Sequence, residues 1–166
     1  MANTFPVLTY TVSDADLAAG IPTQDDILAS LPGSVPEHFW VSTSRNSAHQ
    51  HVMQELIAGR KEYEPLAYIT KQVAVVRTAD LPSTIEALRR LLSDIEQDPS
   101  RFPSHHYWGY SDEQVLACLK DARPDRHIPA DQYFEPQAFF MFLLSQLAVL
   151  EEARSEGKSV YYIEIR

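Results

Sequence analysis

The sequence predicts an α+β fold: one small, mostly antiparallel sheet of about three to five strands, covered by about four to six helices. Three observations predict this class. Segments rich in β-branched and aromatic residues alternate with segments of helical periodicity in a mixed order. The chain ends in a long apolar helical segment followed by a strand-like segment. Its 166 residues, 45% of them hydrophobic, suit a single domain spanning 1–166 that buries a core without disulfides.

The C-terminal segment predicts a long buried helix and a closing strand. Six large apolar residues stand together at 139–144, so this helix is apolar almost all round, as expected inside a core. Pro136 suits a first helical turn, and Gly157 suits the left-handed position after a last turn. The dense β-branched and aromatic residues of 159–165 then predict the final strand. We expect the other elements to pack on this helix.

The other elements are predicted from caps, breakers and periodicity. In chain order they are a strand at 5–12, a helical turn at 13–20, a helix at 24–31 capped by Thr23, a strand at 38–42, a helix at 46–58, one or two strands within 66–78, a helix from 83 to about 97, and a helix starting at 111. Pro6 suggests that the first strand begins at a sheet edge. Ser83 with Glu86 has the capping-box pattern, and Ser111 opens the next helix.

The charge of the chain is unevenly distributed. The net charge is −9, and residues 1–44 contain five acids and no Lys or Arg. These acids are Asp14, Asp16, Asp25, Asp26 and Glu37. Such a field repels phosphate backbones, so nucleic acid is not the expected partner. It attracts a basic protein and speeds the encounter with it. The alternative is that the acids only keep the protein soluble.

Composition also predicts the compartment. Cys118 is the only cysteine, so no intrachain disulfide can form, which favours a reducing environment. We see no signal peptide, and the longest apolar run is far shorter than the roughly 20 residues of a membrane span. We therefore expect a cytoplasmic protein with no membrane partner.

An irregular segment at 101–110 is the second candidate for partner binding. It contains Arg101, His105, His106, Tyr107, Trp108 and Tyr110. Tyr, Trp and Arg dominate protein–protein hot spots, and loops commonly carry function. The alternative is that these rings fold back over one end of the core. Both can hold at once, with Phe102 buried and Tyr107 or Trp108 presented to a partner.

The histidine spacing does not predict a metal site, and no cofactor is expected. His49 and His51 are two apart on a predicted helix, so they point in different directions. His105 and His106 are adjacent, without a Cys, Asp or Glu at ligand spacing nearby in the sequence. Cys118 stands on an apolar helix face and suits a packed thiol better than a nucleophile. Glycine-rich phosphate loops and nucleophile elbows are also absent from the sequence.

Residues 39–49 combine a short strand, Ser42-Thr43-Ser44 and a helix start. This element resembles the strand–Ser-Thr-Ser–helix element of cholera-toxin-like mono-ADP-ribosyltransferases, which bind NAD there. The resemblance implies an active or degenerate NAD-binding protein. The family's first-strand arginine has no counterpart, because the first arginine here is Arg45, and Asp112-Glu113-Gln114 only approaches the family's Glu-x-Glu pattern. The alternative is that residues 42–47 simply cap a helix.

The C-terminal ending, a helix, a Glu-Gly-Lys turn and a Tyr-Tyr-Ile-Glu-Ile strand, resembles small α+β bacterial proteins of the YfbM-like and toxin-immunity kind. That resemblance implies a cytoplasmic protein that binds and blocks a cognate toxin. We therefore expect a non-catalytic protein-binding module, rather than an enzyme, that holds a basic partner through its acids and the 101–110 segment. A subunit of a larger assembly is a third interpretation.

Overall fold

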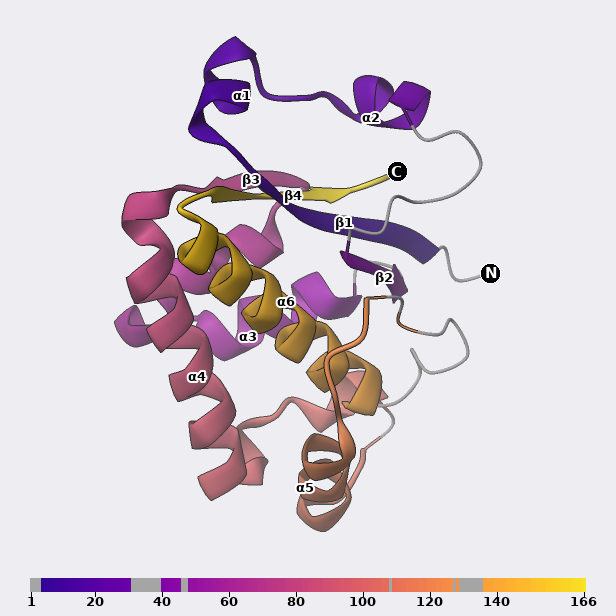
Figure 1. Cartoon of the computed structure of the whole chain (residues 1–166). Coiled ribbons are helices and arrows are strands. Elements are labelled where there is room, and N and C mark those ends of the chain that lie inside the picture. Colours follow the sequence, from indigo (N-terminus) through magenta and orange to yellow (C-terminus); the bar gives the residue numbers. More distant parts are fainter. Residues whose placement is uncertain (1–3, 31–39, 46–47, 108, 127, 129–135) are drawn as a thin grey trace.

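The computed structural model describes residues 4–30, 40–45, 48–107, 109–126, 128 and 136–166. In chain order the elements within these ranges are β1 (Thr4–Val12), α1 (Asp14–Ala19), α2 (Gln24–Ser30), β2 (Trp40–Arg45), α3 (Ala48–Ile57), the 3-10 helix η1 (Lys61–Thr70), β3 (Val73–Val76), η2 (Thr78–Asp80), α4 (Leu81–Gln97), η3 (Pro99–Arg101), η4 (Ser104–Tyr107), α5 (Asp112–Asp121), α6 (Pro136–Glu156) and β4 (Ser159–Glu164). Figure 1 shows one sheet with α1 and α2 on one side and α3, α4 and α6 on the other.

The four strands form one antiparallel sheet in the order β2-β1-β4-β3. The first and last strands of the chain lie side by side in its centre, where Thr9 faces Tyr162 and Tyr10 faces Tyr161. On its other side β4 pairs with β3, and Ala74 faces Tyr162. The predicted α+β class, with a long C-terminal helix followed by a final strand, is confirmed.

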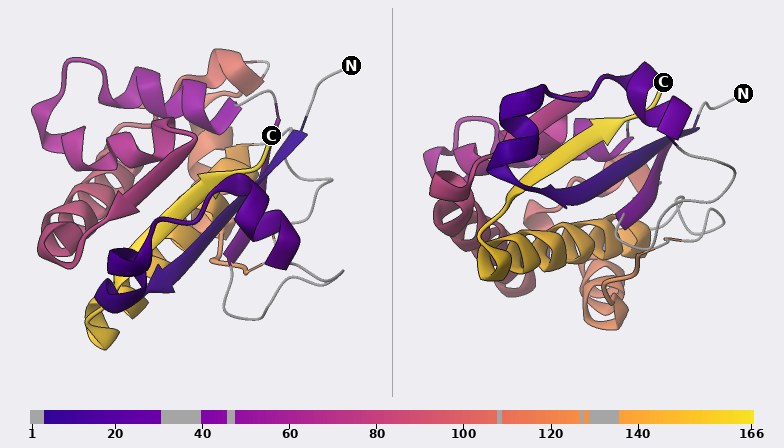
Figure 2. Two further views of the ribbon diagram at one scale, coloured as in Figure 1. Left: turned by 90° about the horizontal axis from the view of Figure 1, so that it is seen from above. Right: turned by 45° about the horizontal axis from the view of Figure 1, so that its top comes forward.

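Both faces of this sheet are covered, because side chains alternate along each strand. Tyr162 of β4 belongs to the larger core, which the strands form with α3, η1, α4 and α6. Its neighbours Tyr161 and Ile163 belong to a smaller core on the opposite face. Leu17 of α1 and Ile27 of α2 complete that smaller core, and both views in Figure 2 show the two short helices lying over the sheet. Burial on both faces explains the almost continuous apolar run of β4.

Helix α6 has the bounds and the burial that the sequence predicts. Pro136 is its first residue, a position where the missing N–H leaves no helical bond unmade. Beyond its last turn, Gly157 has a φ of 69°, the left-handed conformation that favours glycine. The Lys158 N–H then donates to the Ala153 carbonyl over 2.9 Å, as in a Schellman-type ending. Buried residues on nearly all sides of α6 make it the central element of the larger core.

Of the one or two strands expected within residues 66–78, the structure has one. Residues up to Thr70 belong to the 3-10 helix η1, and only β3 is a strand. The reason is a period of three residues: Tyr63, Leu66 and Ile69 are all fully buried. A 3-10 helix has three residues per turn, so these side chains lie in one row against the core.

Two boundary expectations are also corrected. Helix α4 begins at Leu81, so Ser83 lies inside its first turn and its hydroxyl donates to the Asp80 carbonyl over 3.0 Å instead of capping. Pro6 lies in a central strand and not at a sheet edge. Its carbonyl accepts from the Ile165 N–H over 2.8 Å, so its nitrogen also points toward the β4 side. The β1–β4 register begins at Val7, so Pro6 lies just ahead of its first pair, where the missing N–H leaves the contact with Ile165 with a single hydrogen bond.

A buried chain of polar side chains crosses the larger core. The Tyr68 hydroxyl donates to Gln146 Oε1 over 2.9 Å, and Gln146 Nε2 donates to Thr9 Oγ1 over 2.8 Å. These side chains come from η1, α6 and β1, so the chain ties three elements together. Each buried polar atom in it has a partner, which is the condition for such a network to stabilise a fold.

We expect Tyr68→Phe to lower the free energy of unfolding by about 1–3 kcal/mol, because it leaves Gln146 Oε1 buried without its donor. Urea unfolding measures the change. Tyr107→Phe is the matched control, since the Tyr107 hydroxyl is buried without a hydrogen-bond partner among the described residues. Removing that hydroxyl should cost little. Equal losses in the two variants would contradict a stabilising role for the network.

Candidate functional site

The acidic residues of the N-terminal region lie on the two short helices that cover the sheet. Asp14 and Asp16 belong to the first turn of α1, and Asp25 and Asp26 to the first turn of α2. All four are exposed. Glu37 lies outside the described residues. Figure 1 shows α1 and α2 on the same side of the sheet. The exposed face of these two helices, which carries the four acids, is called here the α1–α2 surface.

Local capping explains where the two helices start. The Ser13 hydroxyl accepts from the Asp16 N–H over 3.1 Å. At α2 the bonds are reciprocal: Thr23 Oγ1 accepts from the Asp26 N–H over 3.2 Å, and Asp26 Oδ2 accepts from the Thr23 N–H over 2.9 Å. The predicted cap at Thr23 is thus confirmed. The hydrogen bond from the Thr23 backbone lowers the pKa of Asp26, so its carboxylate is negatively charged at neutral pH.

The α1–α2 surface also exposes two large apolar side chains. Ile21, between the two helices, is 48% exposed and Leu28, on α2, is 47% exposed. Exposed single apolar residues are ordinary on a protein surface. Here both lie on a segment that otherwise presents carboxylates, so the surface combines apolar contact area with a negative field. That combination is typical of binding surfaces, in which apolar anchors lie within a polar rim.

The same segment is held firmly against the sheet. Besides the buried Leu17 and Ile27, the Tyr161 hydroxyl donates to the Pro22 carbonyl. Gln24 forms two bonds to the last residue: its Nε2 donates to the Arg166 carbonyl over 2.6 Å, and its Oε1 accepts from the Arg166 N–H over 3.0 Å. A surface fixed in this way loses little conformational entropy when a partner binds.

The aromatic residues of the 101–110 segment face inward where they are described. Tyr107 is buried and its ring stacks on Phe102, with ring centroids 5.7 Å apart at 22°. This corrects the expectation that Tyr107 is presented to a partner: the ring instead completes the core beside α6, where Phe102 lies 5.1 Å from Phe140. Burial also raises the pKa of Tyr107. Tyr110 is half-buried against the same core, and Trp108 lies outside the described residues.

The other partner-binding candidates of the 101–110 segment are accessible to solvent, but they lie on the other side of the sheet from the acids of α1 and α2. Arg101 is exposed, with its Nε 4.0 Å from Asp98 Oδ2. His105 and His106 belong to η4, which follows the buried Phe102 on the side of the sheet that α3, α4 and α6 cover. Figures 1 and 2 show α1 and α2 over the opposite face. The two halves of the expected partner surface therefore do not form one continuous patch.

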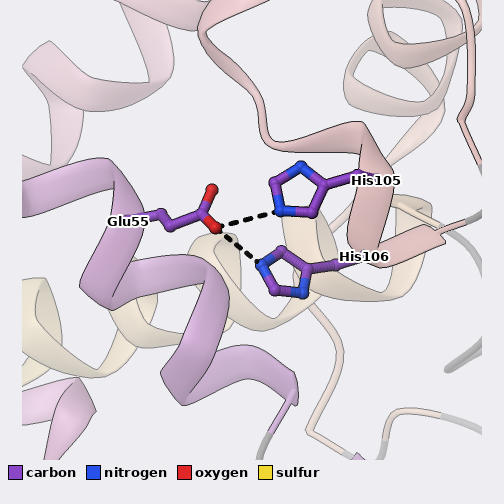
Figure 3. Close-up of side chains that lie close together, drawn as sticks. All are labelled: Glu55, His105 and His106. Carbon is purple, nitrogen blue, oxygen red and sulfur yellow. Dashed lines mark hydrogen bonds and ion pairs between the residues drawn. The ribbon is translucent and has the colours of Figure 1, made fainter.

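The structure brings Glu55 of α3 to His105 and His106, as Figure 3 shows. Glu55 Oε1 lies 3.0 Å from His105 Nε2 and 3.2 Å from His106 Nε2. Sequence reasoning missed Glu55, because it precedes the histidine pair by 50 residues. The helical pattern of 46–58 could have placed it on an exposed face, but only packing of η4 beside α3 makes the contact.

The Ser-Thr-Ser element lies on an outer strand of the sheet. Residues 42–44 belong to β2, where Ser42 faces Val7 and Ser44 faces Phe5 across β1, and α3 follows. The strand-then-helix order is as expected, although the first residues of the expected strand lie outside the described part. Gln114, in the other part of the transferase pattern, accepts from the Ser111 N–H over 2.9 Å and completes a capping box at the start of α5, the helix that Ser111 is predicted to open. The Gln114 side chain therefore caps a helix.

Comparisons with protein-family models, with curated proteins and with solved structures found no match. A search of the described residues for a helix long and apolar enough to cross a membrane found none.

Proposed function

We propose that this protein is a non-catalytic binding module that holds a basic protein through the α1–α2 surface and inhibits it, in the manner of bacterial toxin-immunity proteins. The observation that carries the proposal is the coincidence, on one rigid segment, of four exposed carboxylates with two exposed apolar side chains. The carboxylates speed the encounter with a positive partner, and the apolar side chains supply contact area that slows dissociation.

The proposed interface leaves out the aromatic residues of the 101–110 segment. Tyr107 is part of the core, and the segment lies on the other side of the sheet from α1 and α2. The proposal includes a cytoplasmic location, because the single cysteine favours a reducing compartment. It excludes nucleic acid as the partner, since a net charge of −9 repels phosphate.

The test uses the intact chain as bait in its native host, at low and at high salt, with bound proteins identified by mass spectrometry. We expect one stoichiometric basic protein that salt releases and whose activity the bait suppresses. The triple variant Asp14→Asn, Asp16→Asn, Asp25→Asn should slow association with that protein by about tenfold or more at low salt. Asp26 is kept, because its carboxylate caps α2.

The matched control neutralises the same number of exposed acids on the other side of the sheet, with Glu62→Gln, Glu86→Gln and Glu113→Gln on η1, α4 and α5. This control should bind as the wild type does. Equal losses in the two triple variants would show that only net charge matters and not the α1–α2 surface. Absence of a basic partner at either salt concentration would overturn the proposal.

A further inference from the structure

We propose that Glu55, His105 and His106 bind a divalent transition-metal ion of the zinc type. Two imidazole nitrogens and one carboxylate oxygen are a donor set that zinc accepts in proteins. The three ligand atoms all lie within 4.8 Å of one another. They come from two elements, with the carboxylate on α3 and both imidazoles on η4. The proposed ion is independent of the partner proposed for the α1–α2 surface.

The distances between the ligand atoms suit a small ion. In a tetrahedral zinc site with bonds of about 2.0–2.1 Å, neighbouring ligand atoms lie roughly 3.3 Å apart. Glu55 Oε1 is 3.0 Å from His105 Nε2 and 3.2 Å from His106 Nε2, which is close to the separation that a shared ion would impose on these atoms. Figure 3 shows the two rings on the same side of the carboxylate.

The backbone that carries the histidines is fixed on both sides. Phe102 and Tyr107 are buried and stacked on each other, so the residues between them form a short arch on the surface. The Gly109 N–H donates to the Ser104 carbonyl over 3.0 Å and closes that arch, with Gly109 at a φ of 73°. Because η4 is held at both ends, the backbone that carries the two imidazoles is positioned before any ion arrives.

The helix that carries the carboxylate is also fixed. Val52, Met53 and Leu56 of α3 are buried in the larger core, so the helix cannot turn about its axis without leaving it. Figure 3 shows the Glu55 side chain pointing toward the two histidines. A packed helix and an anchored loop hold the backbones of the three ligands at a constant separation, which favours binding of one ion by all three.

Exposure and charge both favour an entering cation. The side chains of His105, Glu55 and His106 are 65%, 47% and 25% exposed, so a hydrated ion reaches them from solvent. The net charge of −9 raises the local concentration of cations. Three protein ligands leave at least one coordination position for water or for an external ligand. A bound ion would also join α3 to η4, and so stabilise the folded state in proportion to its binding.

Zinc titration of the intact chain, after dialysis against a chelator, tests the site. Isothermal titration calorimetry should show one Zn²⁺ per chain, and excess ZnCl₂ should raise the melting temperature. Glu55→Gln, His105→Asn and His106→Asn should each raise the zinc dissociation constant more than about tenfold, since even indirect partners of metal ligands contribute 10–100-fold. The double variant His105→Asn, His106→Asn should remove both the heat and the thermal shift.

Two exposed side chains provide matched controls. His51→Asn removes a histidine from α3, and Glu86→Gln removes a carboxylate from α4, and both variants should bind zinc as the wild type does. Circular dichroism and melting in chelator separate lost binding from lost folding. If the wild type shows neither heat nor thermal shift with zinc, these side chains only hydrogen-bond to one another, and the proposal is overturned. Zinc retained by the double variant, or lost equally in Glu86→Gln, would also overturn it, because the ion would then be held elsewhere.

Discussion

Phe139→Ala should lower the free energy of unfolding by about 3–5 kcal/mol, the range for truncating a buried aromatic side chain. Phe139 is fully buried near the start of α6. Its ring lies 5.7 Å from that of Phe102 and 5.9 Å from that of Phe140, measured between centroids. The substitution therefore opens a cavity where α6 packs against the 99–107 segment. Urea or guanidinium unfolding, followed by circular dichroism, measures the loss.

Two variants serve as controls for this prediction. Phe139→Leu keeps most of the volume and should cost less than about 1.5 kcal/mol. Leu28→Ala truncates an apolar side chain that is half exposed, and should change stability by only about 0.5 kcal/mol. If Phe139→Ala costs no more than Leu28→Ala, then α6 is not the centre of the core.

The protein should lose stability in mild acid because of His49. This side chain is buried, and neither ring nitrogen has a hydrogen-bond partner among the described residues. Its ring packs 4.7 Å from that of Phe142 and 5.6 Å from that of Phe139. Burial disfavours the charged imidazolium and lowers the pKa of His49 to about 4.

The direction of the effect follows from which state binds the proton. Between the unfolded pKa of about 6.5 and the folded pKa of about 4, the unfolded chain takes up a proton at His49 that the folded chain does not. Above pH 6.5 the neutral ring of His49 makes its full contribution to the free energy of unfolding. This contribution falls as the pH is lowered toward 4. The loss from this residue amounts to about 3 kcal/mol at the low end of that range.

His49→Leu isolates this contribution, because every other titrating group remains. Unfolding free energies of the wild type and of the variant, measured from pH 7.5 to pH 4, should diverge below pH 6.5, with the variant losing less. His51→Asn removes an exposed histidine of the same helix and should leave the wild-type pH dependence unchanged. Parallel curves for the wild type and His49→Leu would contradict the burial of a neutral imidazole.

Local signals determined much of this fold. Pro136 and Gly157 bound α6, and Ser111 with Gln114 starts α5, because each acts within one helical turn and needs no distant partner. The central position of β4 could not be predicted from local signals. Its apolar run is compatible with any strand that is covered on both faces, and its place in the sheet is set by pairing with β1 and β3. The 3-10 helix at 61–70 was missed for a related reason, since β-rich residues at a period of three resemble a strand until packing chooses between them.

The candidate sites, like the fold, depend partly on local sequence and partly on long-range contacts. The sequence by itself determined the acidic, base-free N-terminal region, because charge is a property of composition. Only the tertiary structure decided that α1 and α2 lie over the sheet, that Tyr107 turns into the core, and that Glu55 meets His105 and His106. Each of these depends on contacts between residues far apart in the chain. Such contacts form when buried area is maximised over the whole fold, and a spacing rule within one segment does not encode them.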